Sequence, residues 1–265
     1  MSSAIPLQIA GLLSLFPLAA IAVTARLQRN ALFWLLLAAA LAGSFGVFGQ
    51  SLINGWQAGL SSNLWASCAI ALAAFAALNL VNGEAFRLAA LLLPYLIIFA
   101  LLALLFASFD EPIPAVASEA WFRAHVLLAI ASYGILTLGA IAGVAVLIQE
   151  RTLKRRQTGW AELALPPLSV AEYLQIKLLL WAAVFMATAL ASGFANTFMD
   201  TGTLPQLSHK VLLSLLAFVV LVALLVVHRV TGMRGRRAAR WVLVGYLFLT
   251  LAYPGVKFVR DVLLG

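Results

Sequence analysis

Hydrophobic residues in this chain form long, nearly continuous runs, unlike the alternating pattern of half-buried strands or the one-sided pattern of surface helices. Each run holds roughly 20 residues, enough for an α-helix to cross a hydrocarbon layer of about 30 Å. Polar or charged residues bound every run. The pattern therefore predicts eight transmembrane helices, near residues 5–25, 31–49, 64–82, 88–107, 124–149, 172–197, 208–228 and 241–258.

The composition agrees with this pattern and excludes a soluble protein. Hydrophobic residues make up 64% of the 265 residues and charged residues 10%, whereas soluble domains carry roughly 45–50% and 25%. No polar stretch is long enough for a second domain, and the N-terminus lacks the pattern of a removable signal peptide. We therefore expect an all-α fold, a polytopic integral membrane helical bundle that forms a single membrane domain over residues 1–265.

Prolines and a capping motif mark some helix ends and bends. Pro166-Pro167 precede the sixth run, and Ser169 followed three residues later by Glu172 predicts a capping box at the start of that helix. Pro94 and Pro254 fall inside the fourth and eighth runs, where the missing amide hydrogen predicts kinks.

The distribution of Lys and Arg predicts the orientation in the membrane. Thirteen of the 17 basic residues follow the first, third, fifth and seventh runs, and four lie on the opposite side. Because cytoplasmic loops hold the excess of Lys and Arg, both termini are expected outside the cytoplasm. The loops 108–123 and 198–208 then face the exterior or periplasm, and the loops 150–171 and 229–240 face the cytoplasm.

The residue types present exclude several kinds of chemistry. Cys68 is the single cysteine, so the chain has no internal disulfide, no zinc site on paired cysteines and no Cys-x-x-Cys-His motif for covalent haem. The net charge of +8 reflects loop topology and not nucleic-acid binding. Asp200-Thr201-Gly202 copies the aspartic-protease triplet, but that chemistry needs two carboxylates sharing a proton, and the triplet is also common in turns. Hydrolase and ATPase motifs are absent, so we expect a protein that is not an enzyme.

Three histidines are the most informative ionisable residues, because unpaired ionisable groups at membrane depth are costly. His125 opens the fifth run and His209 the seventh, both on the external side, whereas His228 closes the seventh on the cytoplasmic side. His209 and His228 lie 19 residues apart, or about 28 Å of helix, so they cannot share a metal. His125 and His209 can, and we expect their ring nitrogens within about 4–8 Å of each other.

Two imidazoles from different helices are what a bis-His haem iron requires, with apolar and aromatic walls around the macrocycle. Trp121 stands beside His125, and the basic residues Arg123 and Lys210 are suited to pair with haem propionates. The alternative is that a histidine at a helix end is an interfacial polar residue, hydrogen-bonded to a neighbouring loop. Arginines follow His228 in the sequence, so we favour an interfacial role for His228 over a role as haem ligand.

Four stretches in the second half of the chain form a recognisable set. They are His125-Val126 with Ser132-Tyr133; Leu168-Ser169 and Glu172-Tyr173 with Ser192-Gly193; His209-Lys210 with the basic turn 232–239; and Tyr253-Pro254-Gly255-Val256. Together they resemble the cytochrome c assembly, or haem-handling, superfamily of membrane proteins, most closely its YpjD/HemX-like branch. The resemblance covers residues 121–258.

The resemblance implies a haem-associated protein of cytochrome biogenesis, with His125 in the place of the first external family histidine. Haem-exporting members of the CcsA type carry a tryptophan-rich external loop, whereas the corresponding residues 196–202 contain no Trp. The second external family histidine is also missing, and His209 stands as a substitute. His228 lies near the membrane-embedded family histidine, but residues 1–124 hold no partner histidine for it. These departures favour an accessory role over haem translocation to apocytochrome c.

The leading hypothesis is therefore a non-enzymatic accessory of cytochrome biogenesis in the bacterial cytoplasmic (inner) membrane, which binds or organises haem near the outer leaflet. Its expected partners are the lipid bilayer, haem and cytochrome biogenesis proteins, without nucleic acid. One alternative is a transport permease for a small molecule. Another is a regulatory scaffold that docks a cytoplasmic partner through the loop 150–177. A haem absorption band in the purified protein would favour the first.

Overall fold

The computed structural model describes residues 4–53, 59–107, 120–156, 159–202 and 208–255, and every element in these ranges is helical. The long helices are α1 (Ala4–Val23), α2 (Ala31–Ile53), α3 (Leu60–Val81), α4 (Ala89–Leu105), α5 (Ala120–Arg155), α7 (Leu168–Thr201), α8 (His209–Thr231) and α9 (Gly235–Thr250). A short helix, α6 (Trp160–Ala164), lies between α5 and α7. The prediction of an all-α polytopic membrane bundle with about eight helices is confirmed.

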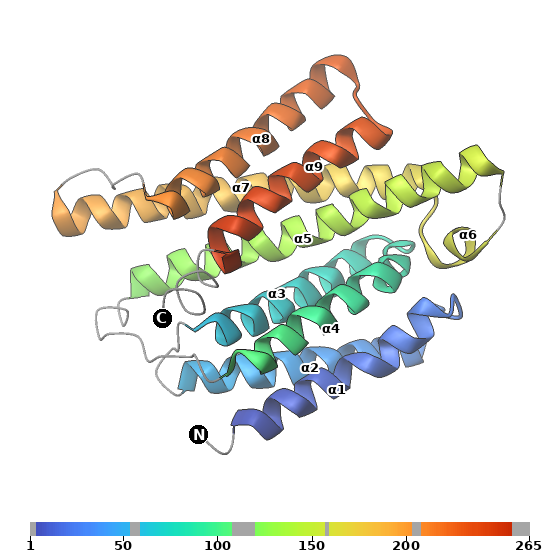
Figure 1. Cartoon of the computed structure of the whole chain (residues 1–265), viewed down its shortest axis with the longest axis horizontal. Helices are drawn as coiled ribbons and strands as arrows, with labels where there is room; N and C mark the ends of the chain where they lie inside the picture. Colours follow the sequence, from blue (N-terminus) through green and yellow to red (C-terminus); the bar gives the residue numbers. More distant parts are fainter. Residues whose placement is uncertain (1–3, 54–58, 108–119, 157–158, 203–207, 256–265) are drawn as a thin grey trace.

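The eight long helices run alternately in opposite directions (Figure 1). The C-terminal ends of α1, α3, α5 and α8 lie at one end of the bundle, and the N-terminal ends of α1, α3, α5 and α8 lie at the other. In the described part of the chain, seven helices are long and apolar enough to span a membrane. The eighth, α9, has 16 residues and continues into a π-helical turn, Leu251–Gly255. This alternation is the arrangement that eight successive spans require.

Helix α5 lies at the centre of the bundle. It packs along α7, and it also contacts α3 on one side and α9 on the other. A large apolar core joins α1–α4 to the part of α5 between Leu138 and Val146. A second core lies between α5, α7, α8 and α9. Residues on α5 therefore contribute to both cores and connect the two halves of the bundle.

The structure corrects several helix ends. Helix α7 begins at Leu168 with Pro167 as its N-cap and no side-chain cap, so the capping box predicted at Ser169 does not form. Pro167 already fixes the entry into the helix, and its carbonyl accepts from the Ala171 amide at 2.9 Å. Residues 120–123, predicted as loop, are the first turn of α5.

Helices α5 and α7 are also longer than their apolar runs. They contain 36 and 34 residues, or about 54 and 51 Å, against a hydrocarbon thickness of about 30 Å. The sequence Phe198–Thr201, predicted as external loop, is the last turn of α7, and Gly202 ends it in a left-handed conformation (φ +67°). Both helices therefore project beyond the hydrocarbon layer.

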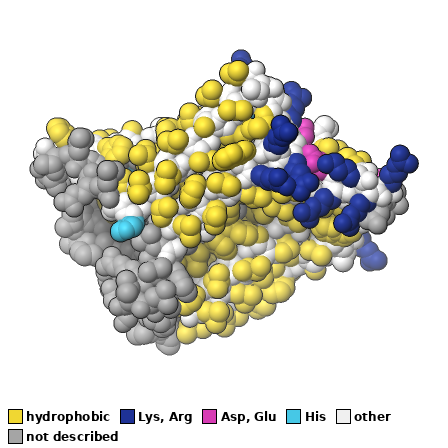
Figure 2. Space-filling view, turned by 45° about the horizontal axis from the view of Figure 1, so that its top comes forward, with side chains coloured by type: hydrophobic (Ala, Val, Ile, Leu, Met, Phe, Trp, Pro, Cys, Tyr) yellow, Lys and Arg dark blue, Asp and Glu magenta, His cyan; other side chains and the backbone are white. Residues whose placement is uncertain are grey.

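Thirteen basic residues gather at the end of the bundle where α1, α3, α5 and α8 finish, called the basic end here. They are Arg26, Arg29, Arg87, Arg151, Lys154, Arg155, Arg156, Lys177, Arg229, Arg234, Arg236, Arg237 and Arg240. Figure 2 shows this end as a patch of Lys and Arg around a few acidic side chains, beside a wide hydrophobic belt. The charge asymmetry seen in the sequence is thus an asymmetry in space.

The connection between α5 and α7 is packed against the bundle. The Gln149 side-chain amide, which is buried, donates to the carbonyls of Ala161 (3.1 Å) and Pro166 (3.0 Å). The Trp160 indole donates to the Val23 carbonyl at the end of α1. Residues 159–167 are therefore held by specific contacts to α5 and α1.

Candidate functional site

His125 lies on the second turn of α5 and faces α7. Its Nδ1 lies 2.9 Å from the Ala189 carbonyl and 3.0 Å from Ser192 Oγ. Because a carbonyl oxygen only accepts, Nδ1 carries the proton, and in the neutral ring Nε2 then bears the lone pair. A backbone carbonyl on one ring nitrogen is the arrangement that orients metal-ligating histidines in proteins.

A glycine on α7 lets the His125 ring approach that helix. A Cβ atom at Gly193 would lie 2.8 Å from Cε1 and 3.3 Å from Nδ1 of His125, closer than real side chains pack. Ser192-Gly193 is one of the residue pairs on which the family resemblance was based. The pair therefore has a structural explanation, since Gly193 admits the ring and Ser192 contacts it.

Trp121 joins the same contact between α5 and α7. Its indole nitrogen donates to the Ser192 carbonyl at 3.3 Å, and half of its surface is exposed. Trp121 and His125, one helical turn apart, therefore both contact Ser192. The sequence had placed Trp121 next to His125 in a loop, and the structure brings them together on one face of a helix.

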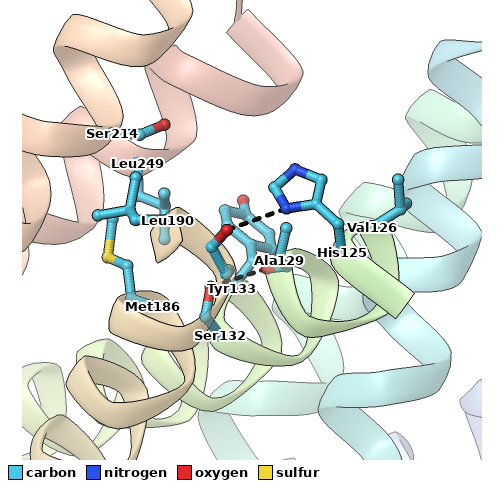
Figure 3. Close-up of a pocket in the computed structure, with 10 residues that line it drawn as sticks. His125, Val126, Ala129, Ser132, Tyr133, Met186, Leu190, Ser214 and Leu249 are labelled. Carbon is cyan, nitrogen blue, oxygen red and sulfur yellow. Dashed lines mark hydrogen bonds between the residues drawn. The ribbon is translucent and has the colours of Figure 1, made fainter. Parts of the chain in front are cut away.

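A cavity of about 110 Å³ opens beside His125 at the junction of four helices. Its walls are mostly apolar and come from α5, α7, α8 and α9, namely Val126, Ala129, Ser132, Tyr133, Met186, Ala189, Leu190, Ser214 and Leu249. In Figure 3 the His125 ring stands on one side of this space, with Met186, Leu190 and Leu249 on the other. His125 is the one histidine among the described residues that line it.

The other predicted residues are placed apart from this cavity. His209 is the first residue of α8 and is exposed. Among the described residues of α8, Ser214, five residues later, is the one that lines the cavity. The backbone of Lys210 belongs to α8, and its side chain lies outside the described part. Arg123 is exposed on the first turn of α5. The expected proximity of the His125 and His209 rings stays a prediction.

His228 lies at the opposite, basic end and closes the turn between α8 and α9. Its Nδ1 donates to the Met233 carbonyl at 2.7 Å, and its own carbonyl accepts from the Gly232 amide at 3.0 Å. Gly232 has a positive φ (+66°), as a helix ending in this way requires. These contacts give His228 a structural part in the turn.

A cluster of hydroxyl groups below the cavity escaped the sequence reasoning. The hydroxyl of Tyr246 (α9) contacts those of Tyr95 (α4), Tyr133 (α5, 3.2 Å) and Thr137 (α5, 3.3 Å), and Tyr133 also contacts Thr250 (3.4 Å). Tyr133 belongs to both features, because its side chain also lines the cavity. Eight residues separate it from His125, or about 12 Å along α5. The cavity therefore leads inward to a polar group inside the membrane.

This polar region ends inside the bundle. From Leu138 to Ile148 every residue of α5 is apolar or glycine, which is about 16 Å of helix. Buried apolar side chains of the neighbouring helices pack around the polar region, among them Leu179 of α7, Leu221 of α8 and Val242 of α9. Along α5, the hydroxyl cluster is therefore separated from the basic end by apolar residues and glycines, whereas α7 contributes a buried polar side chain, Gln175.

The donor chemistry at His125 suits a haem iron, but the enclosed space does not hold the whole macrocycle. Nδ1 is fixed by the Ala189 carbonyl and Nε2 is the basic nitrogen, as iron ligation requires. Pockets that enclose drug-sized ligands measure roughly 300–1,000 Å³, well above the 110 Å³ here. A haem on His125 would therefore extend beyond the cavity described here.

Comparison with known families supplies the decisive observation. The family model described as cytochrome C assembly protein matches residues 25–264. The chain belongs to this family. The match reaches well beyond the stretch 121–258 on which the resemblance was based, and includes α2, α3 and α4. Membership of this family supports a role in cytochrome c biogenesis.

Two relatives are similar to this chain. An uncharacterized 28.8 kDa protein from the nifR3-like 5′ region of Azospirillum brasilense is 40% identical over 255 residues, which are 95% of this chain and 93% of the relative. The inner membrane protein YpjD of Escherichia coli K12 is 28% identical over 175 residues, 65% of each chain. No solved structure matches this chain.

Proposed function

We propose that this family member is a non-enzymatic accessory of cytochrome biogenesis that binds haem near the outer leaflet, with His125 as the iron ligand. The observation that carries the proposal is the contact between His125 Nδ1 and the Ala189 carbonyl at 2.9 Å. This contact orients the ring, and Nε2 is the proposed ligating nitrogen. The ring also lines an apolar cavity, the surroundings that haem prefers.

Around His125, the chain's own residues would hold the group in place. Val126 and Leu190 supply apolar surface, and Trp121 supplies an exposed aromatic face one turn away. Arg123 and Lys210 are the proposed partners of the propionates. His209 is the proposed second nitrogen ligand, a role that requires its ring to approach that of His125. Once bound, haem would supply an iron that carries one electron.

The accessory role is preferred to transport through the bundle. Transporters place their substrate sites at broken helices around polar groups at the midplane, with access to both sides in turn. The apolar stretch of α5 between Thr137 and Gln149 weighs against a polar passage along this helix to the basic end, and no tryptophan-rich loop is present in residues 196–202. The chain is thus proposed to receive or organise haem from the outer side.

The scaffold alternative finds less support, because Trp160, Ala161 and Pro166 of the loop 150–177 are hydrogen-bonded to α1 and α5 of its own bundle. The relative named inner membrane protein YpjD supports the inner membrane as the location. With the basic end on the cytoplasmic side, both termini and His125 would lie toward the periplasm. Cytochrome biogenesis proteins in that compartment are the proposed partners.

The absorption spectrum of the purified full chain tests the proposal. Protein expressed with adequate haem supply, or titrated with haem in detergent, should show a Soret band that is abolished or shifted in His125→Ala. His228→Ala is the matched control, because it also removes an imidazole whose Nδ1 is held by a carbonyl, and its band should be largely intact. Absence of any band in the wild type would refute haem binding. A band lost in the His228 variant but kept in the His125 variant would move the site to the basic end.

A further inference from the structure

The turn between α8 and α9 concentrates positive charge at the basic end. Five arginines fall within residues 229–240, and all five are exposed: Arg229, Arg234, Arg236, Arg237 and Arg240. Guanidinium groups stay charged at every physiological pH. Figure 2 shows the Lys and Arg side chains of this end as a group at the border of the hydrophobic belt.

The carboxylates nearby are engaged with other groups. Glu150 Oε1 accepts from the backbone amide of Arg236 at 2.8 Å, and its Oε2 lies 4.0 Å from Lys154 Nζ. Glu84 pairs with Arg87. Across the described residues, neither of these two ion pairs includes an arginine of the turn. Among the described residues, the five guanidinium groups therefore form no ion pair within 4 Å, although the Glu172 carboxylate lies near the start of α9.

Exposed aromatic side chains set the depth of this surface in the membrane. Trp241 directly follows Arg240, lies one helical turn after Arg237, and is 53% exposed. On α7, Tyr173 is exposed with the Lys177 ammonium 5.7 Å from its ring centroid. Trp and Tyr concentrate at the headgroup level of membrane proteins. With Trp241 at the headgroup level, Arg237 and Arg240 on the preceding turn of α9 would lie at the depth of lipid phosphates.

We propose that Arg237, Arg240 and Trp241, called the α9 lipid surface, bind the headgroups of anionic phospholipids. Arginine forks pair with phosphate oxygens in bidentate fashion, and clusters of Lys and Arg beside a membrane span attract anionic lipids. The N-terminus of α9 is already occupied by Glu150, so the guanidinium groups and not backbone amides hold the phosphate. A soluble polyanion would leave the apolar face of Trp241 without a partner, which favours lipid.

The end of α5 offers a matched control. Arg155 and Arg156 are exposed and basic like Arg237 and Arg240, but they lie five and six residues beyond Glu150, which is level with the start of α9. That distance is about 8 Å farther out along the helix axis. The two pairs carry the same charge and differ in their depth relative to the headgroups.

Native mass spectrometry of the detergent-solubilised full chain tests this inference, with phosphatidylglycerol and phosphatidylcholine as probes. The wild type should retain phosphatidylglycerol preferentially. Arg237→Gln with Arg240→Gln should weaken that retention by roughly 30-fold, whereas Arg155→Gln with Arg156→Gln should change it less than about threefold. Arg237→Lys with Arg240→Lys should bind phosphatidylglycerol more tightly than the glutamine variant and less tightly than the wild type, because the charge is kept and the bidentate fork is lost.

Three results would overturn the proposal. One is equal retention of the two lipids by the wild type, and another is an equal loss in both glutamine double variants. The third is tighter retention of a soluble polyanion, such as polyphosphate, than of phosphatidylglycerol by the same surface. The melting temperature of each variant provides the folding control, and these exposed substitutions should leave it nearly unchanged. The readout does not depend on haem, so its failure is distinguishable from failure of the haem proposal.

Discussion

The carboxylate of Glu150, near the end of α5, accepts a hydrogen bond from the backbone amide of Arg236 at 2.8 Å and so caps the first turn of α9. Gly235, just before this amide, has a positive φ (+64°), and a Cβ there would overlap Glu150 Oε1. Glu172 Oε1 lies 3.3 Å from the same Cβ position. The start of α9 is therefore fixed against both α5 and α7.

Replacing Glu150 tests this contact. Glu150→Ala removes the cap and leaves the first amides of α9 without it, so the free energy of unfolding should fall by about 1 kcal/mol. Gly235→Ala should cost more, because it adds an overlap and a left-handed alanine, which alone costs roughly 1–2 kcal/mol. Glu162→Ala, which truncates an exposed side chain on α6, is the control and should stay within about 0.5 kcal/mol. Thermal unfolding in detergent measures all three, and equal stability of the Glu150 and Glu162 variants would contradict the assignment.

Substitution of Gly193 should separate haem binding from folding. The added Cβ of Gly193→Ala would lie 2.8 Å from His125 Cε1, so the ring must shift from its present position beside the Ala189 carbonyl. Changes to the groups that orient a ligating histidine lower metal affinity by about 10–100-fold, and haem titration should show a loss of that order. Gly46→Ala is the control, because nothing lies within 4 Å of its Cβ position. Unchanged haem affinity in the Gly193 variant would show that the ring position does not matter for binding.

The hydroxyl cluster should contribute measurably to stability. Tyr246→Phe removes a hydroxyl that contacts Tyr95, Tyr133 and Thr137, and a lost buried hydrogen bond costs about 1 kcal/mol. Tyr173→Phe removes an exposed hydroxyl and should change stability by less than about 0.5 kcal/mol. Comparing the melting temperatures of the two variants in the same detergent tests this prediction. If the Tyr246 variant melts with or above the Tyr173 variant, the cluster does not hold α9 to α5.

Hydropathy predicted the number and order of the spans because the length of an apolar run is set by the bilayer. It failed at the ends of α5 and α7, where polar residues such as Trp121 and Arg123 continue the helix. Packing between the two helices, not their composition, extends them there. The capping motif at Ser169 failed for a related reason, since Pro167 had already fixed the start of α7.

The site was partly predictable. His125 stood out as an ionisable residue at a run boundary, and its neighbour Trp121 was found with it. Ser192 and Gly193 carried a signal as part of the resemblance, but their contact with the ring depends on how α5 and α7 pair. Tyr133 carried a signal only as part of the resemblance. Tyr95 and Tyr246 carried none, because a tyrosine inside an apolar run is indistinguishable in sequence from ordinary hydrophobic surface. Only the fold shows that three hydroxyls from three helices meet.

The orientation of the bundle in the membrane can be tested by thiol labelling. The chain suits this method because Cys68 is fully buried. Ser208→Cys places a thiol at the exposed start of α8, and Arg155→Cys places one at the exposed basic end. Thirteen basic residues at one end predict that this end is cytoplasmic. A membrane-impermeant maleimide added to spheroplasts should therefore label the Ser208 variant directly, and the Arg155 variant only after the membrane is opened. Labelling with the opposite sidedness would place His125 on the cytoplasmic side and would remove the outer-leaflet site.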